Sequence, residues 1–356
     1  MRPRLATLLA GLLVVACAPR PAALVPDAFT GAPDRDGISL GPPVAAAPAV
    51  ASLFEITYAT PSGELFRRYV DALSLGYVPD IPLGRGGAVG SIAGTSSIVT
   101  DDAAGSIAIV SALGERKVIA RQATVLPVVA ATAMGFLWIG DGTQVTVADA
   151  EGRALSAVEA PRATPGSRVT GFAFDGFTSF ALMSGPASSV VVDLAQGRRL
   201  ELDALASILD VATVLRHAYV LGVDARDPRH ALRLLDVDLA TLTFARSATL
   251  PISERTAALD GHRIVPTAGG LYVYAAVRAG TRERSLLFSI DQDFAASPLA
   301  LPDDLGLDAA GGVDDALYLF GGAARNVITR VEPATGALAH YVVAPDATLV
   351  RALAVR

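Results

Sequence analysis

Seven strand–turn–strand segments recur along the chain at an interval of roughly 40 to 50 residues, which is the spacing of a structural repeat. In each segment a run rich in Val, Ile or Leu leads into a turn near Gly, Asp or Ala, and a second strand leaves it. A fold made of such units must stack or close them, because a single unit cannot bury its apolar side chains alone. The positions that mark the seven turns are Gly63, Gly114, Gly152, Gly197, Leu242, Ala295 and Gly336.

Two further short strands precede several of these turns, so each unit contains four strands. Examples are SRVTGFAFDG and FTSFALMSG ahead of the turn at Gly197. Four antiparallel strands per unit at this interval predict an all-β fold, a β-propeller of seven four-stranded blades. Blade strands are buried on both faces, which accounts for a chain that is 52% hydrophobic. Six or eight blades remain alternatives, because GYVPDIPLGRGG interrupts the repeat between Gly63 and Gly114.

The two ends of the repeat region predict how the ring closes. The chain ends in the strand-like LVRALAVR, residues 349–356, with nothing after it. Pairing this strand with the first blade would remove an exposed sheet edge. We therefore expect residues 52–356 to form one domain, with 349–356 as the innermost strand of the blade whose outer strands come from 52–70. That assignment leaves the second strand of the blade unaccounted for.

The segment from Gln122 to Gly140 has no charged residue over 19 positions, which is long enough for a transmembrane helix. Pro127 and Gly135 interrupt it, and its Val-rich centre favours strands. We interpret it as an outer strand, a loop and two inner strands.

The N-terminus has the parts of a secretory signal: charged MRPR, an apolar run, and the sequence Val14-Val15-Ala16-Cys17. These four residues resemble the lipobox of bacterial lipoproteins. The resemblance implies a signal peptide over 1–16 and an acylated Cys17, which is the one cysteine of the chain. Because Ala18 rather than Asp follows, it also implies the outer membrane. Residues 17–51, rich in Ala and Pro, are then a tether.

The sequences VDLAQG at 192 and LYLFGG at 317 resemble the repeats of YVTN, NHL and quinoprotein-like propellers. The resemblance covers residues 52–356 and implies the propeller architecture. It brings no active site with it, and the chain departs from the quinoprotein type because Trp138 is its single tryptophan.

Catalytic and metal-binding patterns are weak in this sequence. It has no GxSxG, P-loop or HExxH, and no two of its histidines have the spacing of a metal pair. Stretches such as VVAATAM at 128 and VTGFAF at 169, assigned to inner strands, contain few oxygen donors, and this argues against a calcium-dependent lactonase. We therefore expect no catalytic residue, no metal and no cofactor. The remaining His and Asp residues are interpreted as structural: His217, His230, His262, His340, Asp101, Asp102, Asp303, Asp304, Asp314 and Asp315.

A cluster of basic residues is predicted on one face of the propeller. Loops between second and third strands emerge on the same face, and three long ones, at 223, 278 and 322, belong to consecutive blades. Arginine forks there suit carboxylates, phosphates and protein surfaces, although solvated loops would look the same. The candidate binding residues are Arg226, Arg229, His230, Arg278, Arg282, Arg284 and Arg325.

Two functions are consistent with this sequence. The favoured one is a cell-envelope lipoprotein that binds a protein partner without catalysis, as a scaffold or assembly factor. The alternative is a hydrolase or lyase whose Asp and His residues are brought together by the fold at the mouth of the channel. The net charge of −6, without a basic tail, argues against nucleic acid as a partner.

Overall fold

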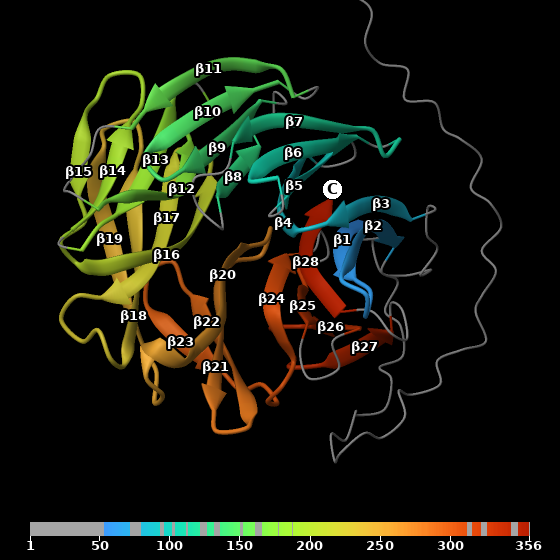
Figure 1. Ribbon diagram of the computed structural model, residues 1–356. Helices are drawn as coiled ribbons and strands as arrows, with labels where there is room; N and C mark the ends of the chain where they lie inside the picture. The colour runs from blue at the N-terminus through green and yellow to red at the C-terminus, as the bar shows by residue number, and fades with distance from the viewer. Residues whose placement is uncertain are drawn as a thin grey trace, which may run out of the picture.

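A computed structural model describes residues 53–355, except 72–79, 93–95, 102–103, 112, 122–126, 132–135, 150–151, 161–165, 177, 187, 312–314, 322–325 and 343–347. These residues form seven four-stranded antiparallel sheets arranged around a central axis (Figure 1). The chain is thus an all-β propeller with seven blades, as the repeat predicts. The signal peptide, Cys17 and the tether lie outside the described residues.

Each blade is given from its innermost to its outermost strand. Blade 1 contains β28 (Thr348–Val355), β1 (Leu53–Ala59), β2 (Glu64–Asp71) and β3 (Ile81–Arg85). Blade 2 contains β4 (Gly87–Ile92), β5 (Ser96–Asp101), β6 (Ser106–Ser111) and β7 (Arg116–Arg121). Blade 3 contains β8 (Val128–Ala131), β9 (Leu137–Asp141), β10 (Gln144–Ala148) and β11 (Ala154–Glu159).

The remaining blades follow the same order. Blade 4 contains β12 (Arg168–Phe174), β13 (Ser179–Ser184), β14 (Ser189–Asp193) and β15 (Arg199–Glu201). Blade 5 contains β16 (Leu205–Val214), β17 (His217–Asp224), β18 (Ala231–Asp238) and β19 (Thr243–Pro251). Blade 6 contains β20 (Leu259–Pro266), β21 (Leu271–Ala279), β22 (Arg282–Ile290) and β23 (Ala296–Leu299). Blade 7 contains β24 (Gly306–Gly311), β25 (Leu317–Gly321), β26 (Val327–Val331) and β27 (Leu338–Val342).

Closure of the ring occurs in blade 1. The C-terminal strand β28 pairs with β1 from Leu53 opposite Val355 to Ala59 opposite Thr348, which confirms the predicted closure. The strand missing from the sequence-based count is the outermost one, β3, and it lies inside the intruding GYVPDIPLGRGG. Consequently β1 and β2 are the second and third strands of this blade.

The turn markers need unusual backbone geometry. Gly63, Gly114, Gly152, Gly197 and Gly336 all have positive φ, where glycine has no steric penalty. In blade 5 Leu242 adopts φ 53°, and in blade 6 the positive φ is at Phe294, one residue before the predicted marker. An aspartate stabilises several of these turns; the Asp193 carboxylate, for example, accepts the backbone N–H groups of residues 195 and 196.

The core consists of apolar layers between neighbouring blades rather than one central cluster. Leu221, Leu234, Val273 and Phe288 belong to the layer between blades 5 and 6, and all four are almost fully buried. Similar layers lie between blades 1 and 2, 2 and 3, 3 and 4, 4 and 5, and 6 and 7. The inner strands remain free to line a channel on the axis.

The strand order fixes two opposite faces. One face, which we call the hairpin face, carries the joins between second and third strands and the connections between blades, such as residues 225–230, 252–258 and 280–281. The other, which we call the turn face, carries the joins between first and second strands and the turns between third and fourth strands. Residues 267–270 and 291–295 are on the turn face.

The apolar segment 122–140 contributes strands in the part that the structure describes. Val128–Ala131 forms β8, the innermost strand of blade 3, and Leu137 begins β9, so both predicted inner strands are present. Among the described residues, the helical segment is the short 3-10 turn Thr256–Ala258, and no helix there could span a membrane.

Candidate functional site

Two of the three predicted loops lie on the hairpin face, in consecutive blades. Residues 225–230 join β17 to β18 in blade 5, and residues 280–281 join β21 to β22 in blade 6. The third predicted loop, at 322–325, lies outside the described residues, and Arg325 with it. The structure therefore brings the other six predicted binding residues to one side of one face.

Two of these arginines are tied to carboxylates of the same face. The Nε atom of Arg278 lies 2.8 Å from the Asp260 carboxylate, and Arg284 donates to Glu254 and to the Ser253 hydroxyl. Burial acts to raise the pKa of Glu254, but the hydrogen bonds from Ser253 and Arg284 outweigh it and lower the pKa below its ordinary value. Arg278 and Arg284 are thereby held in place by the protein itself.

The other arginines of this region are exposed and have no side-chain ion pair or hydrogen bond within the described part of the chain. Arg226, Arg229 and Arg282 were predicted. Arg255 was missed, because it lies in the connection between blades 5 and 6 rather than in a hairpin. Hydrogen bonds from Thr256 to the carbonyl groups of residues 228 and 229 hold that connection against the blade 5 hairpin.

Between these two segments lies a shallow groove of about 290 Å³. Arg229 and Arg255 line it, together with Pro228, Thr256 and Ala257. His230 lies at the edge of this region, with its Nδ1 3.3 Å from the carbonyl oxygen of residue 254. The groove is therefore an arginine-lined depression on the hairpin face.

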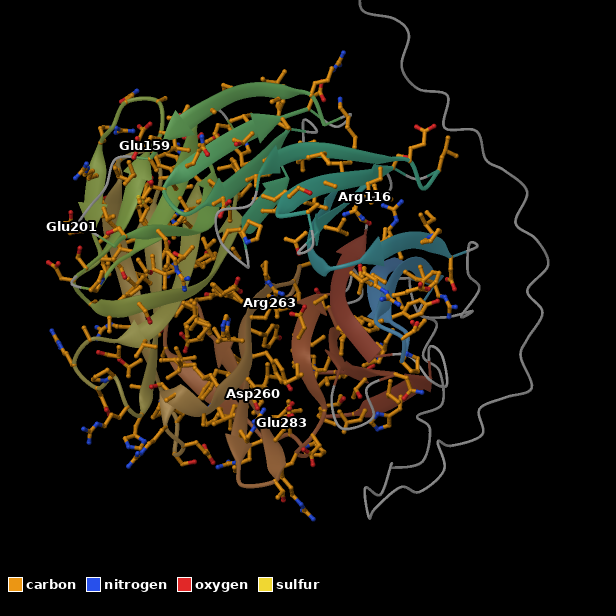
Figure 2. All side chains as sticks on the ribbon, in the orientation of Figure 1. Arg116, Glu159, Glu201, Asp260, Arg263 and Glu283 are labelled. Atoms are coloured by element: carbon orange, nitrogen blue, oxygen red, sulfur yellow. The ribbon has the colours of Figure 1, made fainter. Side chains whose placement is uncertain are left out.

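The face is mixed in charge rather than basic, which corrects the sequence interpretation. The connections between blades bring acidic residues to the hairpin face, and the sequence prediction considered the residues of the hairpins alone. Figure 2 shows Asp260 and Glu283 at the hairpin end of blade 6, well away from Arg263. The Asp304 carboxylate accepts the backbone N–H of Glu283 at 2.7 Å. Cationic character is thus local to the four arginines without partners: Arg226, Arg229, Arg255 and Arg282.

A second group of charged residues lies on the inner strands of blades 5, 6 and 7. Arg263 of β20 lies at the inner edge of blade 6 (Figure 2). Its guanidinium lies 2.7 Å from the Asp308 carboxylate of β24 and 3.6 Å from the Asp210 carboxylate of β16. The other Asp210 oxygen accepts the backbone N–H of Ile264 at 2.7 Å. These contacts join three blades through their innermost strands.

β-bulges place the two aspartates. The inner strands β4, β12, β20 and β24 each skip one residue in their pairing, and the next residue is Gly90, Gly171, Gly261 or Asp308. Strand β16 skips two residues, at 206 and 209, and Asp210 follows the second. Gly261 is required, because a Cβ there would lie 1.9 Å from the carbonyl oxygen of Leu307. In β16 and β24 the residue at the corresponding position carries a side chain, Asp210 or Asp308. Bulges redirect side chains in this way next to functional sites.

His262 is beside Arg263 on β20. Its Nδ1 is buried without a hydrogen-bond partner among the described residues. Burial lowers the pKa of His262, so the imidazole is neutral at pH 7. Burial raises the pKa of Asp210, against the charge of Arg263. Burial alone would lower the pKa of Arg263, but Asp308 and Asp210 together raise it, so the guanidinium stays charged.

This group was not predicted from the sequence, and the inner strands contain more oxygen donors than the prediction assumed. The stretches at 128 and 169, on which that prediction rests, belong to blades 3 and 4, whereas the aspartates lie in blades 5 and 7. The described residues contain no cluster of three metal-ligating side chains. Two other histidines have structural contacts: His217 Nδ1 is 2.7 Å from Asp236, and His340 Nδ1 is 3.0 Å from the Thr329 hydroxyl.

No protein-family model and no curated protein sequence matches this chain. Its fold resembles dihydro-heme d1 dehydrogenase NirN in complex with DHE, with a TM-score of 0.54 and 16% sequence identity. The match covers 82% of this chain but only 64% of the NirN chain. It also resembles virginiamycin B lyase from Staphylococcus aureus, with a TM-score of 0.51 and 10% identity over 74% of this chain and 90% of the lyase. These neighbours are YVTN/NHL-like β-propeller proteins, which confirms the predicted architecture. At such identities the likeness shows the fold alone.

Proposed function

We propose that this chain is a lipid-anchored protein of the bacterial cell envelope whose propeller binds a protein partner through the hairpin face of blades 5 and 6. The observation that carries the proposal is the group of four exposed arginines, Arg226, Arg229, Arg255 and Arg282, which have no partner among the described residues. Two of them line the groove of about 290 Å³.

The contrast with their neighbours supports a binding role. Arg278 and Arg284 on the same face each pair with a carboxylate of the chain itself, so their positive charge is already compensated. A guanidinium without an internal partner can form a two-pronged contact with a carboxylate of another protein. Arginine is also among the residues enriched in the energetically important parts of protein interfaces. The partner should therefore present acidic side chains.

Acylation of Cys17 would tether the propeller to a membrane. Stable anchoring needs more than one acyl chain, which the lipoprotein type of modification supplies. A tether of residues 18–51 in extended form spans roughly 3 Å per residue, which allows the propeller to reach a partner away from the bilayer. Replacement of Cys17 by Ser should move the protein from the membrane fraction to the soluble fraction. A C17S protein that remains membrane-bound would refute the anchor.

The binding role is tested by affinity isolation from membranes with a fourfold variant, Arg226, Arg229, Arg255 and Arg282 to Ala. The matched control is Arg199→Ala with Arg216→Ala, because both residues are exposed and lie away from the hairpin face. The proposal predicts a protein that co-purifies with wild type and with the control but not with the fourfold variant. Retention of the same protein by the fourfold variant would refute the proposed face.

A second candidate function is a hydrolase or lyase reaction in the channel, and the observation that favours it is the inner-strand group. His262 is neutral with a buried free nitrogen, and burial raises the pKa of Asp210 nearby, so the group contains a candidate base and a carboxyl group of perturbed pKa. Native mass spectrometry of the purified protein tests this role. A bound small molecule that is lost in His262→Gln would support it, and an empty channel in wild type would count against it.

A further inference from the structure

A groove of about 370 Å³ lies on the turn face, at the seam between blades 5 and 6. It is on the side of the ring opposite the four unpaired arginines, and nothing proposed above uses it. Its lining includes Tyr219 and Arg246 from blade 5, Asp291 and Phe294 from the last turn of blade 6, and the Gly269–Gly270 segment. We propose that this groove binds a free aromatic α-amino acid.

The floor of the groove is a fixed stack of aromatic rings. The Tyr219 ring lies 6.2 Å from the Phe294 ring at an interplanar angle of 23°, and the His217 imidazole continues the stack 6.4 Å from Tyr219. Phe294 is buried, and its positive φ is imposed by the turn. The partly exposed Tyr219 ring lines the groove, so a flat ligand ring can pack against it without a rearrangement of the protein, which lowers the entropic cost of binding.

Arg246 provides fixed N–H donors at this floor. Its guanidinium carbon lies 4.9 Å from the centre of the Phe294 ring. Its Nε and Nη2 donate to the Asp236 carboxylate, and its Nη1 donates to the carbonyl oxygen of Gln292 at 2.8 Å. A guanidinium has five N–H donors, so two remain. Since 44% of the side chain is exposed, these two can reach a ligand carboxylate.

Asp291 supplies a negative charge on the same groove. One of its oxygens accepts the backbone N–H of Ala295 at 2.8 Å, and the residue is exposed, so its other oxygen can accept from a ligand ammonium. Asp291 would repel a simple carboxylate, and a simple amine would leave the two remaining N–H donors of Arg246 without an acceptor. A zwitterion satisfies both groups, and this selects an α-amino acid over an anion or a cation.

The Tyr219 hydroxyl adds a polar contact. It has no hydrogen-bond partner among the described residues, and burial, followed by the charge of Asp236, raises the pKa of Tyr219, so the hydroxyl keeps its proton. The opposite wall stays low, because Gly269 has no side chain; a Cβ there would lie 3.0 Å from the Asp315 carboxyl group. The groove thus has an aromatic floor and a backbone wall, between which a flat ligand can lie.

Titration calorimetry with L-phenylalanine tests the proposal, with L-alanine, N-acetyl-L-phenylalanine and L-phenylalaninamide as comparison ligands. We expect saturable binding of phenylalanine, and at least about fivefold weaker binding of each comparison ligand, since each lacks one of the three contacts. The variants Asp291→Asn and Tyr219→Phe preserve shape and should weaken phenylalanine binding while the melting temperature stays constant. Arg216→Ala, at an exposed position on the same face, should bind like wild type.

Three results would overturn the inference. They are the absence of saturable phenylalanine binding up to about 10 mM, equal affinity for alanine, and full affinity in the Asp291→Asn variant. None of them bears on the protein partner of the hairpin face, because the two faces share no residue.

Discussion

Arginine occurs in two contrasting settings in this propeller, the inner strands and the hairpin face. Arg263 is held between the carboxylates of Asp308 and Asp210, and it joins the innermost strands of three blades. Arg229 and Arg255 line an open groove and have no partner among the described residues. Arginine therefore stabilises the packing of the blades on the inner strands, and on the hairpin face it is free to contact another molecule. Pairing, rather than the number of arginines, distinguishes a structural cluster from a candidate interface.

The largest effect that this comparison predicts is on stability at Arg263. Its replacement by Ala leaves Asp210 and Asp308 without their counterion. We expect the free energy of unfolding to fall by about 2 to 3 kcal/mol. This is less than for a fully buried ion pair, because a third of the Arg263 side chain is exposed. Denaturant unfolding measures this loss. The paired control is Arg282→Ala, which should change stability by less than about 0.5 kcal/mol. Equal losses in the two variants would remove the distinction between the regions.

A smaller effect is predicted at the tied pair of the hairpin face. Glu254→Gln removes the charge that Arg284 satisfies. Because 42% of the Arg284 side chain is exposed, we expect the free energy of unfolding to fall by only about 0.2 to 1 kcal/mol. Because the pKa of Glu254 is lowered in the folded protein, its stabilisation is present above its unfolded pKa and is lost as the pH falls through the folded value. The difference in melting temperature between wild type and the Gln variant should therefore vanish in acid. A difference that persists there would show that the charge is not its cause.

The smallest predicted effect concerns the protonation of His262. Burial lowers the pKa of this imidazole below its ordinary value of 6.5, so the folded state favours the neutral ring. This contribution to stability is complete above pH 6.5 and declines as the pH falls below it. NMR titration of the four histidines, assigned with His262→Gln, should give a value below 6.5 for His262. A value above 6.5 would mean that the Asp210 and Asp308 charges, not burial, control this site.

The sequence predicts the parts of this fold that depend on local patterns. Turn glycines such as Gly152 and Gly197 mark the repeat, because positive φ leaves a visible residue preference. Closure by the C-terminal strand followed from the need to pair a free edge. Strand β3 was missed, because Pro82 and three glycines at 84, 86 and 87 hide its strand character.

The functional regions were predictable only in part. Arginines in long hairpins could be assigned to one face, because strand order fixes where hairpins emerge. Arg255 and the acidic residues of the connections between blades required knowledge of which segments neighbour one another. The inner-strand aspartates Asp210 and Asp308 depend on bulges, and a bulge changes the direction of side chains without a sequence signal of its own.

Site-specific photocrosslinking tests the availability of the hairpin face most directly, since the single lysine, Lys117, makes amine-reactive reagents uninformative. A photoreactive residue is placed at Ala257, beside Arg255 in the groove, and in a separate protein at Leu215, which is 86% exposed on the turn face. We predict a discrete protein adduct from position 257 in cells, no adduct from 215, and loss of the 257 adduct when Arg226, Arg229, Arg255 and Arg282 are changed to Ala. An adduct from 257 that survives the arginine replacements, or adducts of equal yield from both faces, would contradict the proposed interface.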